Sequence, residues 1–450
     1  MVKFWNGESV QWRLTPCLDG RTGVMEQGEP GQLLLHMEEK PDAEEVRRSS
    51  ARAAAQLRTL ESSSALLDAA PVVEVLGGEG LAALIQGAEL ALYRQETWKE
   101  KQEDKPFALY LTGTERADAG KVLEETAALD RWICFARDLT NRPANKLTPV
   151  MLAQAVAQAA EGLPVEVRVL DESETRALGM KAFHAVGDSS DNPPRLIVLR
   201  WRGGREEDAP IALVGKGVCF DSGGYSLKTS MRGMKGDMAG GAAVSAALLA
   251  LAENRVPVNV TAVIPAVENR ISPASFLPDD VIGSMSGKTI EIGSTDAEGR
   301  LILADAITYA IEKENACKVV DIATLTGAIA RMLGGVAAGV MANDDAFYAA
   351  LQAAAEHTGE KFWRMPDYPE YKKLIESPVA DLYNSSDGCG AIAAGLFLGA
   401  FAGETPWLHL DIAGTGHAGK MSQPYQPKGA TGMGVATLYR LCRDMAEEKR

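Results

Sequence analysis

Near-continuous apolar runs constrain the fold of this chain more than any other feature of its sequence. They cover residues 211–220, 258–265, 319–323 and 407–412, and the first is interrupted only by a lysine. Helical segments over residues 239–252 and 300–312 fall between them. Strands that are apolar on both faces are typical of parallel sheets covered by helices on both sides. The sequence therefore predicts an α/β fold with a mainly parallel central sheet flanked by helices.

The chain has 450 residues, a length that favours two domains. Strands at residues 32–36, 72–76 and 107–111 predict a smaller N-terminal α/β domain over residues 1–118. Two helices are expected in this domain. The first follows the charged run at residues 38–48 and ends near residue 67, and the second covers residues 80–93. A helix over residues 119–140 ends at an Asn-Arg-Pro stop signal and is expected to connect the domains. The larger C-terminal domain is expected over residues 141–450, with further strands at 165–170 and 195–201 and a helix at 148–162.

Charge and cysteine usage restrict the classes of partner. The net charge is −15, and such a chain on average repels nucleic acid and anionic membranes. The six cysteines are scattered without a CxxC pair, which favours a reducing compartment over a disulfide framework. Residues 1–13 have no apolar signal core, and no apolar stretch is long enough to span a bilayer without Gly, Pro or charge. We therefore expect a cytoplasmic protein that does not bind membranes.

Acidic residues gather where the predicted strands end and helices begin. Asp221 follows the 211–220 strand, Asp237 precedes the 239–252 helix, and Asp296 and Glu298 precede the 300–312 helix. Sites in open α/β sheets form outside the carboxyl ends of the strands. If these loops converge, four carboxylates can all stay ionised only with cations among them. Two ions that share bridging carboxylates would form a two-metal hydrolytic site.

Each of these residues also has a simpler interpretation. An aspartate before a helix is usually an N-cap, and Thr295 with Glu298 fits a capping box. Lys216 lies inside an apolar strand, where lysine is rare unless it is paired or deprotonated. A neutral amine can bind a metal ion, so Lys216 is either a ligand or a salt-bridge partner.

Two other patterns do not indicate a site. Residues 283–289 resemble a phosphate loop but are one residue short of its spacing, so a polar hairpin turn is the better interpretation. The five histidines have no HExxH or paired spacing, and His409 in an alternating strand is more often structural than catalytic. A serine hydrolase is not favoured, because the GxSxG elbow is absent.

Several motifs in one order resemble the leucyl aminopeptidase family, also called the cytosol aminopeptidases. Residues 294–301 read STDAEGRL, where the family signature is NTDAEGRL, and residues 214–228 match VGKG-x-x-FDSGG-x-x-x-K. Further matches lie at residues 141–149, 323–328, 379–382 and 407–414, so the resemblance spans roughly 134–438. Residues before this span resemble the family only loosely.

The resemblance implies roles for individual residues. Asp221 and Glu298 would bridge two metal ions. Lys228 and Arg300 would be the catalytic pair, with Arg300 holding a bicarbonate ion. The full set of implied metal ligands is Lys216, Asp221, Asp237, Asp296 and Glu298, and the implied substrate-binding residues are Met234, Thr324, Leu325 and Gly327.

The family also implies hydrolysis of the N-terminal peptide bond of peptides with a free N-terminus, in a homohexamer with zinc, manganese or magnesium. The chain departs from the pattern at Ser294, which replaces the usual Asn, and in a slightly shorter loop between Lys228 and Asp237. Two alternatives stay open. One is a non-enzymatic role, such as DNA binding or a structural function, although the acidic charge disfavours nucleic acid. The other is a two-metal hydrolase of another substrate class, such as a phosphatase.

Overall fold

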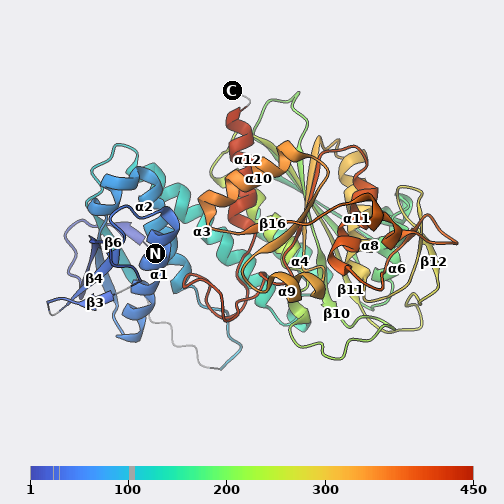
Figure 1. Ribbon diagram of the computed structural model, residues 1–450, viewed down its shortest axis with the longest axis horizontal. Coiled ribbons are helices and arrows are strands. Elements are labelled where there is room, and N and C mark those ends of the chain that lie inside the picture. Colours follow the sequence, from blue (N-terminus) through green and yellow to red (C-terminus); the bar gives the residue numbers. More distant parts are fainter. Residues whose placement is uncertain (1, 24, 30, 101–106, 449–450) are drawn as a thin grey trace. The chain divides into compact units, whose positions relative to one another are not determined.

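The computed structural model describes the chain except for residues 1, 24, 30, 101–106, 449 and 450 (Figure 1). The chain forms two compact units, one of residues 1–134 and 421–428 and the other of residues 135–420 and 429–450. The division falls inside helix α3 (Ala119–Asn141), which confirms the predicted helix. The proposed domain boundaries at residues 118 and 140 stay a prediction.

The larger unit is built on a nine-stranded sheet. Its strands are β7 (Val165–Leu170), β8 (Arg195–Arg202), β9 (Ile211–Gly215), β10 (Gly217–Asp221), β11 (Asn259–Asn269), β14 (Lys318–Ala323), β15 (Ala338–Ala342), β16 (Phe362–Arg364) and β18 (Trp407–Asp411). The order is β16-β15-β18-β14-β9-β11-β8-β7, and β10 also pairs with β11. The central strands β18, β14, β9 and β11 are parallel neighbours, whereas the β15–β18, β11–β8 and β8–β7 pairs are antiparallel. The predicted α/β fold with a mainly parallel central sheet is confirmed.

Helices cover both faces of this sheet. They are α4 (Pro149–Ala159), α5 (Glu172–Ala177), α6 (Lys181–Gly187), α7 (Ala239–Glu253), α8 (Glu298–Glu312), α9 (Gly327–Leu333), α10 (Asp345–Thr358), α11 (Gly390–Ala402) and α12 (Val435–Glu448). Helix α7 packs against β9, β11, β14 and α12, and α10 packs on α12. Helix α8 packs on β9, β11 and β14, and it also packs against α6 and α11. These helices lie across the sheet from α10 and α12 (Figure 1). The sheet is thus buried on both faces, as its apolar strands require.

The apolar run at residues 211–220 forms two strands instead of the single strand that the sequence predicts. Strand β9 lies between β11 and β14, whereas β10 pairs with β11 alone. The break falls at Lys216, whose backbone N–H donates to the carbonyl of Ile322. The break is one residue long, and the register against β11 is the same on both sides of it, with Val214 opposite Val263 and Gly217 opposite Ala266.

A small three-stranded sheet confirms the hairpin at residues 283–289. Strands β12 (Val281–Gly283) and β13 (Thr289–Glu291) pair antiparallel, and β13 pairs parallel with β17 (Leu382–Tyr383). The segment that resembles a phosphate loop is therefore the turn of a β-hairpin.

Helix α6 begins without a capping side chain of its own, and a buried aspartate of α8 supplies one. Asp305 accepts hydrogen bonds from the backbone N–H of Phe183 at 2.9 Å and of Met285 at 2.7 Å, each with a different carboxylate oxygen. Burial raises the pKa of Asp305 to about 7. The carboxyl group thus links α8 to the start of α6 and to the β12–β13 hairpin.

Replacing Asp305 with asparagine should therefore lower the free energy of unfolding by about 1–3 kcal/mol. An amide has one acceptor oxygen, so one of the two backbone N–H groups would face an NH₂ group. Urea titration should show a lower midpoint for Asp305→Asn than for Asp191→Asn, which changes an exposed aspartate. Equal midpoints would contradict the capping role.

Besides the first part of α3, the smaller unit has a six-stranded sheet and two helices that pack on each other. Its elements are β1 (Val2–Phe4), β2 (Trp12–Leu18), β3 (Met25–Gln27), β4 (Gln32–Met37), α1 (Ala43–Thr59), β5 (Ser64–Asp68), α2 (Ala70–Leu92) and β6 (Ala108–Thr112). The order is β1-β6-β5-β2-β4-β3, parallel except for the β3–β4 pair.

Two predictions for this unit are wrong. The helix expected to reach residue 67 ends at Thr59, and residues 64–68 form β5 between β2 and β6. Residues 72–76, predicted as a strand, lie in α2, which has Pro71 in its first turn. Residues 64–68 form a strand because they pair with buried neighbours in the sheet. Residues 72–76 are helical because a helix begins at the preceding proline.

Among the described helices, α2 alone has the length and apolar composition that crossing a membrane would require, and 56% of its most apolar window is buried in the fold. It is kinked at Gly77 and packs on α1. These contacts are those of a core helix. Cys219, Cys317, Cys389 and Cys442 are free thiols.

Candidate metal and substrate site

The carboxyl ends of the central strands meet where the sequence places its acidic residues. Asp221 is the last residue of β10 and is buried. One of its oxygens accepts hydrogen bonds from the backbone N–H of Gly223 and from the side-chain amide of Asn269, both at 2.8 Å. Its other oxygen, Oδ2, lies 2.7 Å from Lys228 Nζ.

Asp296 and Glu298 reach this space from the connection between β13 and α8. Glu298 is the first residue of α8, although the sequence places it before the helix, and the N-cap position is Ala297 without a capping side chain. Thr295 bonds instead to the loop after β10, donating to the carbonyl of Gly223 at 2.6 Å and accepting from the N–H of Ser226. The capping-box interpretation is therefore wrong.

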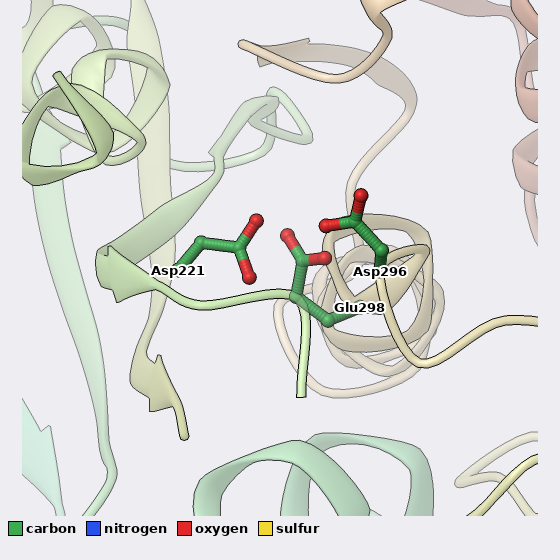
Figure 2. A group of neighbouring side chains, drawn as sticks. All are labelled: Asp221, Asp296 and Glu298. Atoms are coloured by element: carbon green, nitrogen blue, oxygen red, sulfur yellow. The ribbon is translucent and has the colours of Figure 1, made fainter. Parts of the chain in front are cut away.

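Three carboxylates converge from these two segments. In Figure 2 the side chains of Asp221, Asp296 and Glu298 point toward one another. Each offers an oxygen that lies within 4.8 Å of the others. Oxygen atoms at this separation can coordinate the same cation, so the arrangement has the ligand chemistry of a divalent metal site.

Asp237 is connected to this carboxylate cluster by Lys216, which contacts both Asp237 and Glu298. It follows the short helix η2 (Met234–Gly236) and does not cap α7, because the N-cap position of that helix is Met238. Its Oδ1 accepts a hydrogen bond from Thr324 Oγ1 at 2.7 Å, and its Oδ2 lies 2.8 Å from Lys216 Nζ. The N-cap interpretation of Asp237 is therefore also wrong.

Two lysines lie between the carboxylates. Lys216 Nζ is 2.8 Å from Asp237, 2.9 Å from Glu298 Oε1, and donates to the carbonyl of Thr324 at 3.0 Å. Lys228 Nζ is 2.7 Å from Asp221 Oδ2 and forms a second ion pair with Asp296. The ammonium groups thus occupy the positions between carboxylates where positive charge is needed.

The pKa values of Asp237, Asp296 and Glu298 lie above their ordinary values although two ammonium groups contact the cluster. Burial raises the pKa of Asp237 to about 8 despite its contact with Lys216. Burial, with the charges of Glu298 and Asp221, raises that of Asp296 to about 7. Burial and the charge of Asp221 raise the pKa of Glu298 in the same way. A site that holds four carboxyl groups this close favours added cations, and the donor set fits divalent metal ions.

The same carboxylates favour the charged forms of the two lysines. Burial lowers the pKa of Lys216, but the charges of Asp237 and Glu298 outweigh it, so the pKa lies above its ordinary value. The same balance, with Asp221 as the strongest charge, raises the pKa of Lys228. Both side chains are therefore ammonium groups in this arrangement, and Lys216 would have to lose a proton to become a ligand.

Two glycines allow this close packing. A Cβ atom on Gly299 would lie 2.6 Å from Cε of Lys216, and one on Gly236 would lie 2.3 Å from Cε1 of His417. The first glycine belongs to the signature at residues 294–301. It lets the start of α8 approach Lys216, which the sequence alone does not reveal.

The segment after β14 is held by an aspartate at the end of β18. Asp411 Oδ1 accepts from the backbone N–H of Leu325 at 3.1 Å, and Asp411 Oδ2 accepts from Thr326 Oγ1 at 2.7 Å. This fixes the loop that runs from Thr324 to Gly327 along one wall of the site. The positioning roles of Asp411 and Asn269 depend on contacts that are not visible in the sequence.

A cavity of about 500 Å³ opens over these groups. All the residues that the sequence implies as ligands or substrate-binding groups line it, and so does Lys228. The other residues of its wall are not predicted by the sequence analysis: Arg232, Gly233, Gly236, Thr326, Ala330, Ala413 and His417.

Arg300 is the one implied site residue that does not line the cavity. It is buried on α8, its Nε has no hydrogen-bond partner among the described residues, and burial lowers its pKa to about 10. A buried guanidinium nitrogen without an acceptor fits a small anion. His409 lies apart from the cluster: its Nδ1 is 2.6 Å from Asp321 Oδ1 deep in the sheet, which supports the structural interpretation.

Comparison with known proteins places these observations in a family. Residues 134–439 match the family model described as the catalytic domain of the cytosol aminopeptidase family. A probable cytosol aminopeptidase of Clostridium perfringens is 45% identical over 88% of this chain and 83% of that protein. One from Alkaliphilus oremlandii is 40% identical over 92% of this chain and 85% of that protein.

A solved structure extends the similarity to the fold. The bottromycin maturation enzyme BotP in complex with Mn has a TM-score of 0.87 and 31% sequence identity. The match covers 97% of this chain and 100% of that one. The two units described above therefore both have counterparts in a known enzyme.

Proposed function

The chain belongs to the cytosol aminopeptidase family as a leucyl-aminopeptidase-like, metal-dependent hydrolase, and from this premise we propose that it removes the N-terminal residue of peptides at a two-metal site. The converging carboxylates of Asp221, Asp296 and Glu298 are the observation that carries the proposal. The names of the relatives support a place in the cytoplasm.

Five side chains would hold the ions. Asp221 and Glu298 would bridge them, and Lys216, Asp237 and Asp296 would complete the ligand set. Two divalent cations, zinc or manganese with magnesium as an alternative, would supply the Lewis acidity that activates water and polarises the scissile carbonyl. The Mn in the BotP structure supports this choice of metals.

The remaining residues act on the substrate. Lys228 would donate a hydrogen bond to the oxygen that gains negative charge in the transition state. Arg300 would hold a bicarbonate ion as the proton acceptor, since its planar fork suits such an anion. The peptide backbone would bind along the wall formed by Thr324, Leu325 and Gly327, and Met234 would line the pocket for the first side chain.

Substrate class is tested by a direct comparison. We expect the protein with zinc or manganese to release the aromatic amine from leucyl anilides and to leave phosphate esters intact. Hydrolysis of the ester alone would favour a two-metal phosphatase. A salt-sensitive shift of duplex DNA without peptidase activity would favour the DNA-binding alternative.

Assembly gives a separate prediction. The resemblance to the family implies a closed homohexamer, which for a 48.0 kDa chain has a mass of about 290 kDa. Analytical ultracentrifugation at micromolar concentration should find this species. A monomer under these conditions would contradict the hexamer without affecting the assignment of the site.

A further inference from the structure

One cation in the wall of the cavity has no anionic partner among the described residues. Lys216 and Lys228 are both ion-paired with carboxylates of the cluster. Arg232 lines the same cavity and, within the described part of the chain, makes no ion pair and no side-chain hydrogen bond. It is exposed, and it lies in the loop between Lys228 and Met234. Its guanidinium is therefore available to a molecule that enters the cavity.

A second arginine lies next to a residue that lines the cavity. Arg331 is on α9, and its Nη1 is 3.4 Å from the point that a Cβ atom on Gly327 would occupy. Gly327 itself lines the cavity. Arg331 is exposed and likewise has no ion pair among the described residues. Neither arginine is neutralised by a carboxylate among the described residues, although the chain has a net charge of −15.

We propose that Arg232, assisted by Arg331, binds a carboxylate of the peptide substrate and makes it a specificity determinant. This inference rests on the proposed aminopeptidase function and names its preferred substrate class. Arginine binds carboxylates with two parallel, charge-assisted hydrogen bonds that fix the orientation of the bound group.

The carboxylate has two sources. One is the C-terminus of the peptide, which can reach the arginine only in a short peptide, because a cavity of about 500 Å³ has the size of a small-ligand pocket. The other is an acidic side chain in the first or second residue. The competing interpretation is that both arginines are only solvated, and it predicts no preference.

The experiment compares substrates that differ by one carboxylate. Leu-Ala with a free C-terminus is paired with Leu-Ala-amide, which tests the C-terminal source. Leu-Asp-amide is paired with Leu-Asn-amide, and Glu-Ala-amide with Gln-Ala-amide, which tests the side-chain source. For each pair we measure kcat and KM with the manganese-loaded full chain.

The wild-type protein should prefer the carboxylate member of at least one pair by about 10-fold or more in kcat/KM, mainly through KM. Arg232→Gln should bring that ratio close to 1, Arg232→Lys should keep part of it, and Arg331→Gln should lower it less. Arg255→Gln, which changes an exposed arginine after α7, should leave the ratio unchanged. High salt should reduce the wild-type ratio, so the test does not depend on variants that fold.

Equal kcat/KM within every pair, or a preference that survives in folded Arg232→Gln, would overturn the proposal while the aminopeptidase function stands. No cleavage of any peptide by the metal-loaded protein would overturn the proposed function and this inference with it.

Discussion

Replacing Lys228 with alanine should lower kcat by about 10²–10³ while the metal content of the protein stays unchanged. Lys228 is not in the proposed ligand set, and its Nζ forms ion pairs with Asp221 and Asp296, where it competes with cations for the same oxygens. Its removal therefore takes no ligand from the ions. It does remove a donor that acts when charge develops on the substrate oxygen.

Replacing Lys216 with alanine should instead affect metal binding before it affects catalysis. Its side chain is 3% exposed and contacts Asp237 and Glu298, two of the proposed ligands. The variant should lose bound metal first and lose activity as a consequence. Metal per chain, measured beside kcat, separates the two lysines, and Lys313→Ala on the surface near the end of α8 is the matched control.

The assignment is wrong if Lys228→Ala loses metal while Lys216→Ala keeps both ions. If both lysines were only ion-pair partners, each variant would lower the melting temperature without separating metal content from kcat.

The central sheet could be predicted because its strands are apolar on both faces. The runs at residues 258–265, 319–323 and 407–412 lie in β11, β14 and β18. The break between β9 and β10 falls at Lys216, whose contacts with carboxylates of distant segments are not visible in the sequence. The strand at 64–68 was missed for a related reason, since only its neighbours in the sheet distinguish it from a helix end.

The site was partly predictable for the same reasons. The acidic residues stand out because strand ends and helix starts are visible in the sequence. The residues that complete the cavity do not, because Arg232 and His417 reach it from loops that carry no recognisable motif. Burial of Arg300 away from the cavity wall also depends on packing that the sequence does not show.

Removing the metal should lower activity on leucyl anilides by at least about 10³-fold, because the water and the carbonyl would lose their activating charges. Zinc or manganese should restore it. Glu298→Gln should mimic the loss at constant side-chain size, since Glu298 is proposed to bridge both ions. Glu312→Gln, at the exposed far end of α8, should behave as the wild type.

The count of bound ions tests the two-metal site most directly. Metal-stripped protein is dialysed against manganese or zinc, and bound metal and activity are followed in the same samples. We predict two ions per chain, with activity rising as they bind, and fewer in Glu298→Gln. Full activity in thoroughly stripped protein, or activity that saturates with no ion bound at this cluster, would contradict the account.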